Sequence, residues 1–264
     1  MNTIVFLDLD NTFWTDQGVP DSALEAVHAA QAKGNLVFTN TGRARAGTRP
    51  LMQYGLDGRC YAAGAEVFFG TDKISDVRLG ADGSHLLRDA LDVGEGILIA
   101  EGGERCFVRA YDEEMLAELK EVLAQTNDPF IDHEDISQMS EQDHAQIHKY
   151  SLFMRGGVPE SIKASVPGGY IPTTMGEATE FTTPGVTKAS ALETVRSYVE
   201  ERSGKRWRTM ALGDAGNDIP MIRAADVGVS MGNGTDAAKE AADFVTRDIT
   251  DDGLAFAFEC FGLI

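Results

Sequence analysis

Residues 3–12 read TIVFLDLDNT, and residues 209–218 read TMALGDAGND. In each stretch an apolar run leads directly into carboxylates, at Asp8 in the first and at Asp214 in the second. Short apolar runs of this kind are typical of buried strands in a parallel sheet. We therefore predict two buried strands of an α/β fold, each ending in acidic residues.

Helical patterns and further strand-like runs alternate on both sides of these stretches. In residues 22–33, Leu24, Val27 and Ala30 fall on one helical face, and Gly34 ends the pattern. The other elements expected near the two ends of the chain are strands over 35–39 and 227–230 and a helix over 187–202. This alternation predicts βαβ units around a parallel sheet.

In the middle of the chain the order of helical and strand-like patterns changes, and this change predicts a separate α/β unit. The expected elements there are helices over 84–92 and 112–125 and strands over 96–100, 106–109 and 150–154. Short stretches containing Gly or Pro, near 80–83 and 182–185, are suitable hinges. We predict a core domain formed by residues 1–79 and 184–264, split by an inserted cap domain over 80–183.

Composition and charge exclude several classes of partner. The formal net charge of the 264 residues is −19, which argues against broad binding to nucleic acid or to an anionic membrane surface. The three cysteines form no C-x-x-C pair, so neither a disulfide framework nor a zinc site is indicated. No signal-peptide pattern or apolar run of about 20 residues is present. We expect a soluble protein of a reducing cytoplasm.

Asp8 and Asp10 stand two residues apart at the end of the first predicted strand. Both side chains can project on one side of the carboxyl edge of the sheet, where ligands of open α/β sheets bind. Adjacent carboxylates repel each other unless they share a cation or a proton, so the pair indicates a metal site or an acid/base site. Taken alone, the pair is equally compatible with two turn residues after a strand.

A second acidic cluster follows the strand over 209–212, and it contains Asp214, Asn217 and Asp218. Oxygen-rich ligands at strand ends favour a hard cation such as Mg²⁺. Gly213 and Gly216 would let this loop approach the ion closely. The sequence therefore predicts a magnesium site to which both strand ends contribute.

Two further positions are suited to holding an anion. Thr41 and Gly42 follow the strand over 35–39 and offer a hydroxyl and backbone N–H groups. Lys188 stands at the start of a helix, where its charge gains nothing from the helix dipole, and a phosphate would gain from both the lysine and the helix. A solvated surface lysine is the alternative interpretation of Lys188.

Four motifs occur in order, and together they resemble the signature motifs of the haloacid dehalogenase superfamily of phosphohydrolases. They are FLDLDNTFW at 6–14, NTGR at 40–43, GVTKASAL at 185–192 and LGDAGNDIPM at 212–221. The continuation VGVSMGNGTDAAKEAADFVT at 227–246 resembles the Cof-type branch of sugar phosphatases, subclass IIB with a C2 cap. The resemblance implies a Rossmann-like core, with helices on both faces of its sheet and an inserted α/β cap.

The chain departs from the family pattern at two places. Asn11 stands after the second aspartate, where glycine is common. Ala63, Gly64 and Ala65 stand where the family usually enters the cap with Asn-Gly-Ala. Neither departure removes a catalytic group, but both are expected to alter the shape of a loop.

The resemblance implies a role for each acidic residue. Asp8 corresponds to the nucleophile that forms an aspartyl-phosphate, and Asp10 to the acid/base that protonates the leaving oxygen and later activates water. Mg²⁺ would be held by the Asp8 carboxylate, the backbone carbonyl of Asp10 and Asp214. Asp218 would support the metal site from nearby.

The resemblance also implies which groups hold the phosphoryl oxygens. Thr41, the N–H of Gly42, Asn217 and Lys188 would contact them, and Lys188 would also keep Asp8 ionised. These roles describe a magnesium-dependent phosphatase acting on a small phosphorylated metabolite. A phosphomutase using the same residues and a binding or regulatory module without turnover are the alternatives. The sequence makes no prediction of the oligomeric state.

Overall fold

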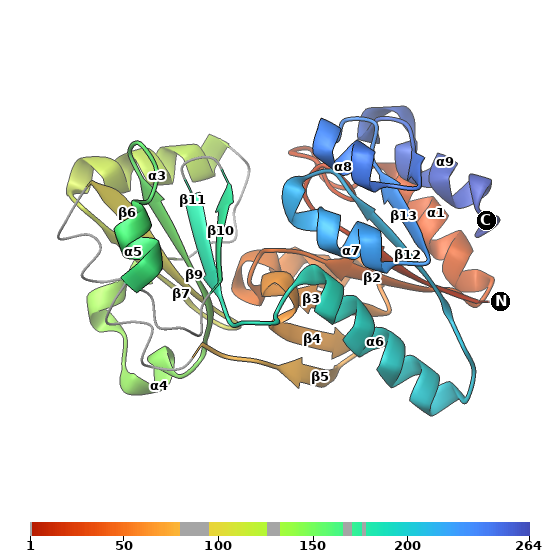
Figure 1. Cartoon of the computed structure of the whole chain (residues 1–264), viewed down its shortest axis with the longest axis horizontal. Helices are drawn as coiled ribbons and strands as arrows, with labels where there is room; N and C mark the ends of the chain where they lie inside the picture. Colours follow the sequence, from red (N-terminus) through yellow and green to blue (C-terminus); the bar gives the residue numbers. More distant parts are fainter. Residues whose placement is uncertain (1, 80–94, 126–132, 166–170, 176–177) are drawn as a thin grey trace. The chain divides into compact units, whose positions relative to one another are not determined.

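The computed structural model describes residues 2–79, 95–125, 133–165, 171–175 and 178–264. The chain forms two compact units (Figure 1). Unit 1 contains Met1–Gly42, Pro50–Asp76 and Thr187–Ile264, and unit 2 contains Arg43–Arg49 and Val77–Val186. Each end of the chain therefore belongs to unit 1.

Unit 1 is built on an eight-stranded sheet in the order β14-β13-β12-β1-β2-β3-β4-β5. The strands are β1 Thr3–Leu7, β2 Leu36–Asn40, β3 Gly58–Tyr61, β4 Glu66–Phe69, β5 Asp72–Asp76, β12 Arg208–Gly213, β13 Val227–Ser230 and β14 Phe244–Val245. All neighbours from β14 to β3 are parallel, and β4 and β5 continue the sheet as antiparallel strands. The parallel part places the carboxyl ends of β1, β2 and β12 along one edge.

Helices cover both faces of the unit 1 sheet. They are α1 Asp21–Ala32, α6 Lys188–Ser203, α7 Ile219–Ala224, α8 Asp236–Ala241 and α9 Gly253–Cys260, with short 3-10 segments η2 Ala62–Gly64, η4 Gly216–Asp218 and η5 Ile249–Asp251. The 3-10 segment η1 Arg45–Tyr54 belongs to unit 2 up to Arg49 and to unit 1 from Pro50. Side chains alternate along β1, so Val5 packs in the cluster that contains residues of α1 and α9, whereas Phe6 packs in the cluster that contains Leu192 of α6 and Met221 of α7. Two apolar cores thus hold the sheet between helical layers.

Unit 2 has its own sheet of six strands, in the order β10-β11-β9-β6-β7-β8 among the described residues. Its elements are β6 Gly96–Gly102, β7 Cys106–Ala110, β8 His133–Asp135, β9 Ile147–Met154, β10 Ile171–Met175, β11 Ala178–Thr182, α3 Glu113–Gln125, α4 Glu141–His144, α5 Glu160–Ser165 and η3 Ile136–Gln138. Only the β7–β8 pair is parallel. Leu98, Tyr150, Leu152 and Phe181 form the centre of its larger apolar cluster.

The predicted α/β fold class is confirmed, with a parallel-rich core and a second α/β unit inserted within it. The strand predicted over 3–8 is β1, the helix predicted over 22–33 is α1, and the strand predicted over 209–212 is β12. The helix predicted over 84–92 lies outside the described residues. The domain limits at 79/80 and 183/184 stay a prediction.

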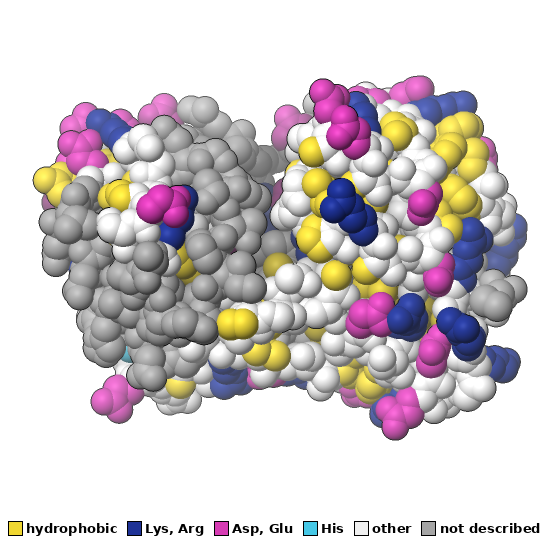
Figure 2. Space-filling view, viewed as in Figure 1, with side chains coloured by type: hydrophobic (Ala, Val, Ile, Leu, Met, Phe, Trp, Pro, Cys, Tyr) yellow, Lys and Arg dark blue, Asp and Glu magenta, His cyan; other side chains and the backbone are white. Residues whose placement is uncertain are grey.

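The described surface carries both signs of charge. On the face of unit 1 in Figure 2, acidic and basic side chains are interspersed among apolar ones. None of the helices in the described parts of the chain is both long enough and apolar enough to cross a membrane.

Candidate active site

The parallel strands β1, β2 and β12 bring three of the sequence motifs to one edge of the unit 1 sheet. Leu7 pairs with Leu212 on one side and with Thr39 on the other. The Asp8 N–H donates to the Leu212 carbonyl at 2.9 Å, so the first motif leaves the sheet beside the fourth. Thr41 follows β2 at the same edge.

Lys188 lies between two carboxylates and is buried. Its Nζ donates to Asp8 Oδ1 at 2.5 Å and to Asp218 Oδ1 at 2.5 Å. The Lys188 side chain is 1% exposed, so Lys188 is not the solvated surface lysine of the alternative interpretation. Burial lowers the pKa of the ammonium, but the two carboxylates raise it more, and the pKa lies above its ordinary value. Lys188 therefore remains charged at neutral pH.

Asp8 and Asp214 are both harder to ionise than ordinary aspartates. Burial raises the pKa of the Asp8 carboxyl, the nearby Asp218 charge raises it further, and Lys188 offsets only part of the effect. Burial and Asp218 likewise raise the pKa of Asp214, to about 6. Because the three carboxyl groups of Asp8, Asp214 and Asp218 meet one ammonium, ionising all of them would leave more negative charge than Lys188 neutralises.

This excess of negative charge suits a cation. Asp8, Asp214 and Asp218 each offer an oxygen, and the three oxygens lie within 4.8 Å of one another. Carboxylate oxygens at strand ends are the donors that a hard divalent ion takes up. These residues therefore fit a metal ion, whereas the carboxylate of Asp10, which is half-buried, is not part of the group of three.

Both carboxylate oxygens of Asp218 accept hydrogen bonds, and those to Oδ2 fix the loop after β12. Its Oδ2 accepts from the backbone N–H groups of Asp214 and Ala215, both at 3.0 Å, while Oδ1 accepts from Lys188. The supporting role of Asp218 at a metal site stays a prediction. Gly213 makes these hydrogen bonds possible, because a Cβ atom at Gly213 would lie 2.4 Å from Asp218 Cβ.

The surroundings of Gly216 differ from those of Gly213. A Cβ atom at Gly216 would meet nothing within 4 Å among the described residues, so no close approach requires glycine there. Crowding at Gly213 comes from Asp218, and the close approach of this loop to an ion stays a prediction.

The groups predicted to hold phosphoryl oxygens lie on the same edge. Thr41 is buried, its N–H donates to the Cys60 carbonyl at 2.9 Å, and its carbonyl accepts from the Ala63 N–H at 2.9 Å. Gly42 and Asn217 are half-buried, and Asn217 Oδ1 has no hydrogen-bond partner among the described residues. The roles of these residues stay a prediction.

The two departures from the family pattern have local structural consequences. Asn11 adopts a φ of +56°, a left-handed conformation that asparagine tolerates better than most residues, and its carbonyl accepts from Asn233 Nδ2 at 2.8 Å. Ala63 also has a positive φ, of +55°. Gly64, with a φ of +105°, packs against the start of α6, where a Cβ atom would lie 2.9 Å from the Thr187 carbonyl oxygen.

Sequence reasoning missed two asparagines that contact this site. Asn233 binds the loop after β1, and its only signal was its place in the Cof-type continuation. Asn40 donates from Nδ2 to the Lys188 carbonyl at 2.8 Å, and nothing in the local pattern indicated that contact. Both residues act on loops or helix ends that carry the predicted groups.

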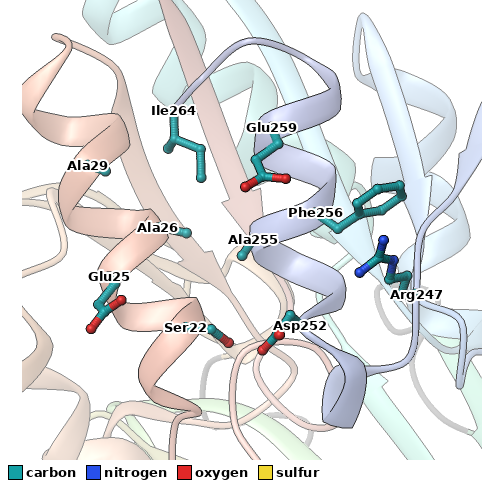
Figure 3. A pocket seen from close by; sticks show the side chains of 10 residues that line it. All are labelled: Ser22, Glu25, Ala26, Ala29, Arg247, Asp252, Ala255, Phe256, Glu259 and Ile264. Atoms are coloured by element: carbon teal, nitrogen blue, oxygen red, sulfur yellow. The ribbon is translucent and has the colours of Figure 1, made fainter.

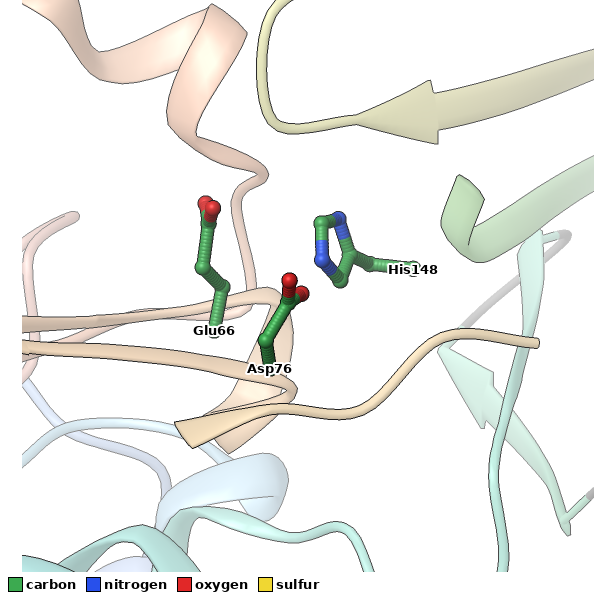
Figure 4. Close-up of side chains that lie close together, drawn as sticks. All are labelled: Glu66, Asp76 and His148. Atoms are coloured by element: carbon green, nitrogen blue, oxygen red, sulfur yellow. The ribbon is translucent and has the colours of Figure 1, made fainter. Parts of the chain in front are cut away.

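A second acidic pair in unit 1 is separate from these strand ends. Glu66 on β4 and Asp76 on β5 lie close together (Figure 4), and Lys73 Nζ lies 2.8 Å from Glu66 Oε1 and 3.2 Å from Asp76 Oδ2. Burial lowers the pKa of Lys73, but hydrogen bonds to the two carboxylates raise it above the ordinary value. Lys73 thus compensates the charge of this pair within the β4–β5 hairpin.

A concave region between α1 and α9 of unit 1 contains none of the predicted site residues. It has a volume of about 430 Å³, and Ala26 and Ala255 lie between the two helices (Figure 3). Arg247 at its margin packs over the Phe256 ring, 4.0 Å from the ring centroid. This groove is distinct from the carboxyl edge of the sheet.

The model of the haloacid dehalogenase-like hydrolases matches residues 5–258. The chain belongs to this family. The match spans the four motifs and both units, so this hydrolase carries the family pattern from β1 to α9. The resemblance on which the enzyme assignment was based is thereby confirmed.

Two curated relatives of the hydrolase are phosphatases by name. The putative phosphatase YkrA of Bacillus subtilis is 27% identical over 267 residues, which cover 99% of this chain and 98% of the relative. The 5-amino-6-(5-phospho-D-ribitylamino)uracil phosphatase YcsE of the same organism is 44% identical over 73 residues, 28% of each chain. The hydrolase therefore has phosphatases among its relatives.

Solved structures confirm the fold of the hydrolase. The subclass IIB sugar phosphatase BT4131 superposes with a TM-score of 0.82 at 24% identity, covering 100% of both chains. At this identity the likeness shows the fold.

Proposed function

We propose that this hydrolase is a magnesium-dependent phosphatase that removes the phosphoryl group from a small phosphorylated metabolite through an aspartyl-phosphate at Asp8. The observation that carries the proposal is the position of Lys188, whose Nζ joins Asp8 to Asp218 in a buried cluster. A buried cation beside a carboxylate favours the ionised, nucleophilic form, so Lys188 offsets part of the effect of burial and of Asp218 on the pKa of Asp8. The phosphatase names of the relatives support the same reaction class.

In the first half-reaction, Asp8 would attack phosphorus while the bond to the leaving oxygen breaks. Asp10, two residues further on, would give its proton to that oxygen, so that the leaving group departs as a neutral alcohol. In the second half-reaction, Asp10 would take a proton from water, which attacks the aspartyl-phosphate and releases inorganic phosphate. Asp8 and Asp10 then return to their starting protonation states.

The residues predicted to hold Mg²⁺ are Asp8, Asp214 and the backbone carbonyl of Asp10. Asp218 would support them through its hydrogen bonds to the loop after β12. The bound ion would supply positive charge to the phosphoryl oxygens and to the crowded carboxylates. The raised pKa values of Asp8 and Asp214 agree with a site built to receive that charge.

Thr41, the N–H of Gly42, Asn217 and Lys188 would contact the non-bridging phosphoryl oxygens. Phosphoryl transfer depends mainly on positioning and charge stabilisation, so a fixed set of donors contributes more than any one residue. The backbone of Thr41 is fixed through Cys60 and Ala63, as such a set requires.

The substrate would be a small metabolite, because the named relative YcsE is a phosphatase of a phosphorylated ribityl compound. Nucleic acid is not an expected partner of a chain with a formal charge of −19. The cytoplasm is the proposed compartment, in keeping with three cysteines that are all free.

The test is release of inorganic phosphate from p-nitrophenyl phosphate and from a panel of sugar and cofactor phosphates. Each compound is assayed with Mg²⁺, with a chelator, and with the Asp8→Asn variant. We expect release that needs Mg²⁺ and disappears in the variant. Transfer of the phosphoryl group to a second substrate hydroxyl instead of water would indicate a mutase. Binding of the panel compounds without any turnover would indicate a binding module.

A further inference from the structure

Asn40 is the last residue of β2 and directly precedes Thr41. Its side chain is fully buried, and its Nδ2 donates to the Lys188 carbonyl at 2.8 Å. Nδ2 also lies 3.6 Å from Met221 Sδ. Asn40 therefore links the end of a strand to the first residue of α6, which is 148 positions away in the sequence.

Only the nitrogen of the Asn40 side-chain amide makes a hydrogen bond among the described residues, whereas both ends of a buried structural amide are usually bonded. Its Oδ1 is buried and has no hydrogen-bond partner among the described residues. A buried polar atom without a partner costs on the order of 1–3 kcal/mol. An apolar side chain at this position would avoid that cost. What asparagine provides, and an apolar residue would not, is the hydrogen bond from Nδ2 to the Lys188 carbonyl.

Asn35, which immediately precedes the same strand β2, shows the contrast. Asn35 is also buried, but its Oδ1 accepts from the Thr3 N–H at 2.9 Å and its Nδ2 donates to the Ala30 carbonyl at 3.1 Å. Both ends of this amide are satisfied, and neither contact leads to the candidate active site. Asn35 is thus a purely structural counterpart of Asn40.

The Lys188 backbone is held from two sides. Thr187 and Ser190 form a capping box at the start of α6, which fixes the helix end along its own axis. Asn40 adds a contact from the sheet, next to Thr41. The sheet thus contributes to the Lys188 backbone a hydrogen bond that the helix does not supply itself.

We propose that Asn40 is a positioning residue that sets Lys188 against Asp8 and Thr41, an inference that rests on the proposed phosphatase function. Asn40 touches no reacting atom, and it acts by fixing the backbone from which the Lys188 side chain extends. A displacement of about 1 Å in such a group can lower the rate by up to about 100-fold.

The first arm of the test compares Asn40→Ala with Asn35→Ala under saturating Mg²⁺. We expect Asn40→Ala to lower kcat by about tenfold or more and to change KM by less than about threefold. The reason is that a displaced Lys188 would stabilise the transition state less, with little effect on substrate binding. Asn35→Ala should lower the melting temperature but leave kcat within about twofold of the wild type. Equal kcat values for Asn40→Ala and the wild type would overturn the inference. Asn40→Ser serves as a milder variant if Asn40→Ala does not fold.

The second arm is a double-mutant cycle with Lys188→Ala. If Asn40 acts through Lys188, Asn40→Ala should lower kcat by less than about twofold further in the Lys188→Ala background. The full tenfold loss in that background would assign Asn40 a role independent of Lys188 and would contradict the proposal.

The third arm needs no turnover, so it separates this inference from the proposed function. In a crystal structure of Asn40→Ala, the Lys188 Nζ to Asp8 Oδ1 separation should exceed hydrogen-bonding range, compared with 2.5 Å in the present structure. An unchanged separation would overturn the inference whether or not the wild type releases phosphate. An inactive wild type with a lengthened separation would instead refute the phosphatase proposal alone.

Discussion

Lys188 Nζ donates a 2.5 Å hydrogen bond to Asp8 Oδ1, although 180 positions separate the two residues in the sequence. Lys188 extends from the first turn of α6, and Asp8 follows directly after the end of β1. Because Asp218 accepts from the same ammonium, the lysine holds two carboxylates that would otherwise repel each other. The behaviour of this cluster under mutation is the basis for the predictions below.

Lys188→Ala should lower kcat/KM by more than tenfold. The variant removes both a donor to the phosphoryl oxygens and the charge that favours ionised Asp8, and loss of one such donor typically costs about 3–4 kcal/mol. Steady-state kinetics on the preferred substrate provide the measurement, with Lys33→Ala, an exposed lysine of the same unit, as the control. Equal efficiency of the two variants would show that Lys188 takes no part in the reaction.

Asp214→Asn should stabilise the metal-free protein at high pH but not at low pH. The pKa of Asp214 is raised from 3.8 to about 6 in the folded chain, so the folded state binds the proton more tightly than the unfolded state. Its ionisation therefore destabilises the fold as pH rises through about 6, and the cost is absent below the unfolded pKa. The neutral amide avoids this cost.

Urea unfolding in chelator measures this effect. At pH 8 we expect the free energy of unfolding of Asp214→Asn to exceed that of the wild type by on the order of 1–2 kcal/mol, allowing for partial solvent screening. At pH 3.5 the two proteins should have nearly equal free energies of unfolding. Addition of Mg²⁺ at pH 8 should remove the gain. An equal gain at both pH values would mean that charge on Asp214 is not its cause.

Gly213→Ala should destabilise unit 1 and disturb the acidic loop. The new Cβ atom would lie 2.4 Å from Asp218 Cβ, and overpacking of this kind typically costs about 1–3 kcal/mol. Gly216→Ala is the matched control in the same loop, since its Cβ would meet nothing within 4 Å among the described residues. Thermal melts that rank the two variants equally would contradict the crowding argument.

Lys149→Met should strongly destabilise unit 2. Lys149 is buried on β9, with Nζ 2.5 Å from Glu180 Oε1 and 3.3 Å from Glu101 Oε1. Removing one partner of a buried ionic group leaves unpaired charge, which costs about 3–5 kcal/mol.

Lys163→Met is the control for Lys149→Met. Lys163 pairs with the largely exposed Glu160 on α5, so its loss should cost less than about 1 kcal/mol. Urea unfolding that finds similar losses for the two methionine variants would show that the Lys149 cluster contributes no more than a surface pair.

The sequence indicated the strands of the core because their signal is local. β1 and β12 are short apolar runs that end in acidic residues, and a parallel sheet must place such ends on one edge. The hairpin formed by β4 and β5 and the three-residue strand β8 were not predicted. β8 has the sequence His-Glu-Asp, whose polar residues give no strand pattern, so its pairing with β7 depends on tertiary contacts.

The sequence named the residues of the candidate site, whose roles stay a prediction, but it gave no information on their contacts. Family resemblance pointed to Lys188, whereas its position at the start of a helix, taken alone, favoured an exposed side chain. Asn40 was quoted as part of the NTGR motif but received no role, because its partner lies on another element and no local periodicity indicates a contact between a strand end and a distant helix. Gly213 was expected to let the loop approach an ion, and its contact with Asp218 was not predicted.

The most direct test of the central claim is to trap the covalent intermediate at Asp8. The enzyme is mixed rapidly with substrate and Mg²⁺, quenched, and treated with borohydride, which reduces an aspartyl-phosphate to homoserine. Peptide mass spectrometry should then find homoserine at position 8, and only when both substrate and Mg²⁺ were present. Efficient phosphate release with Asp8 unmodified at every quench time would contradict this mechanism and would indicate that water attacks the substrate phosphorus directly.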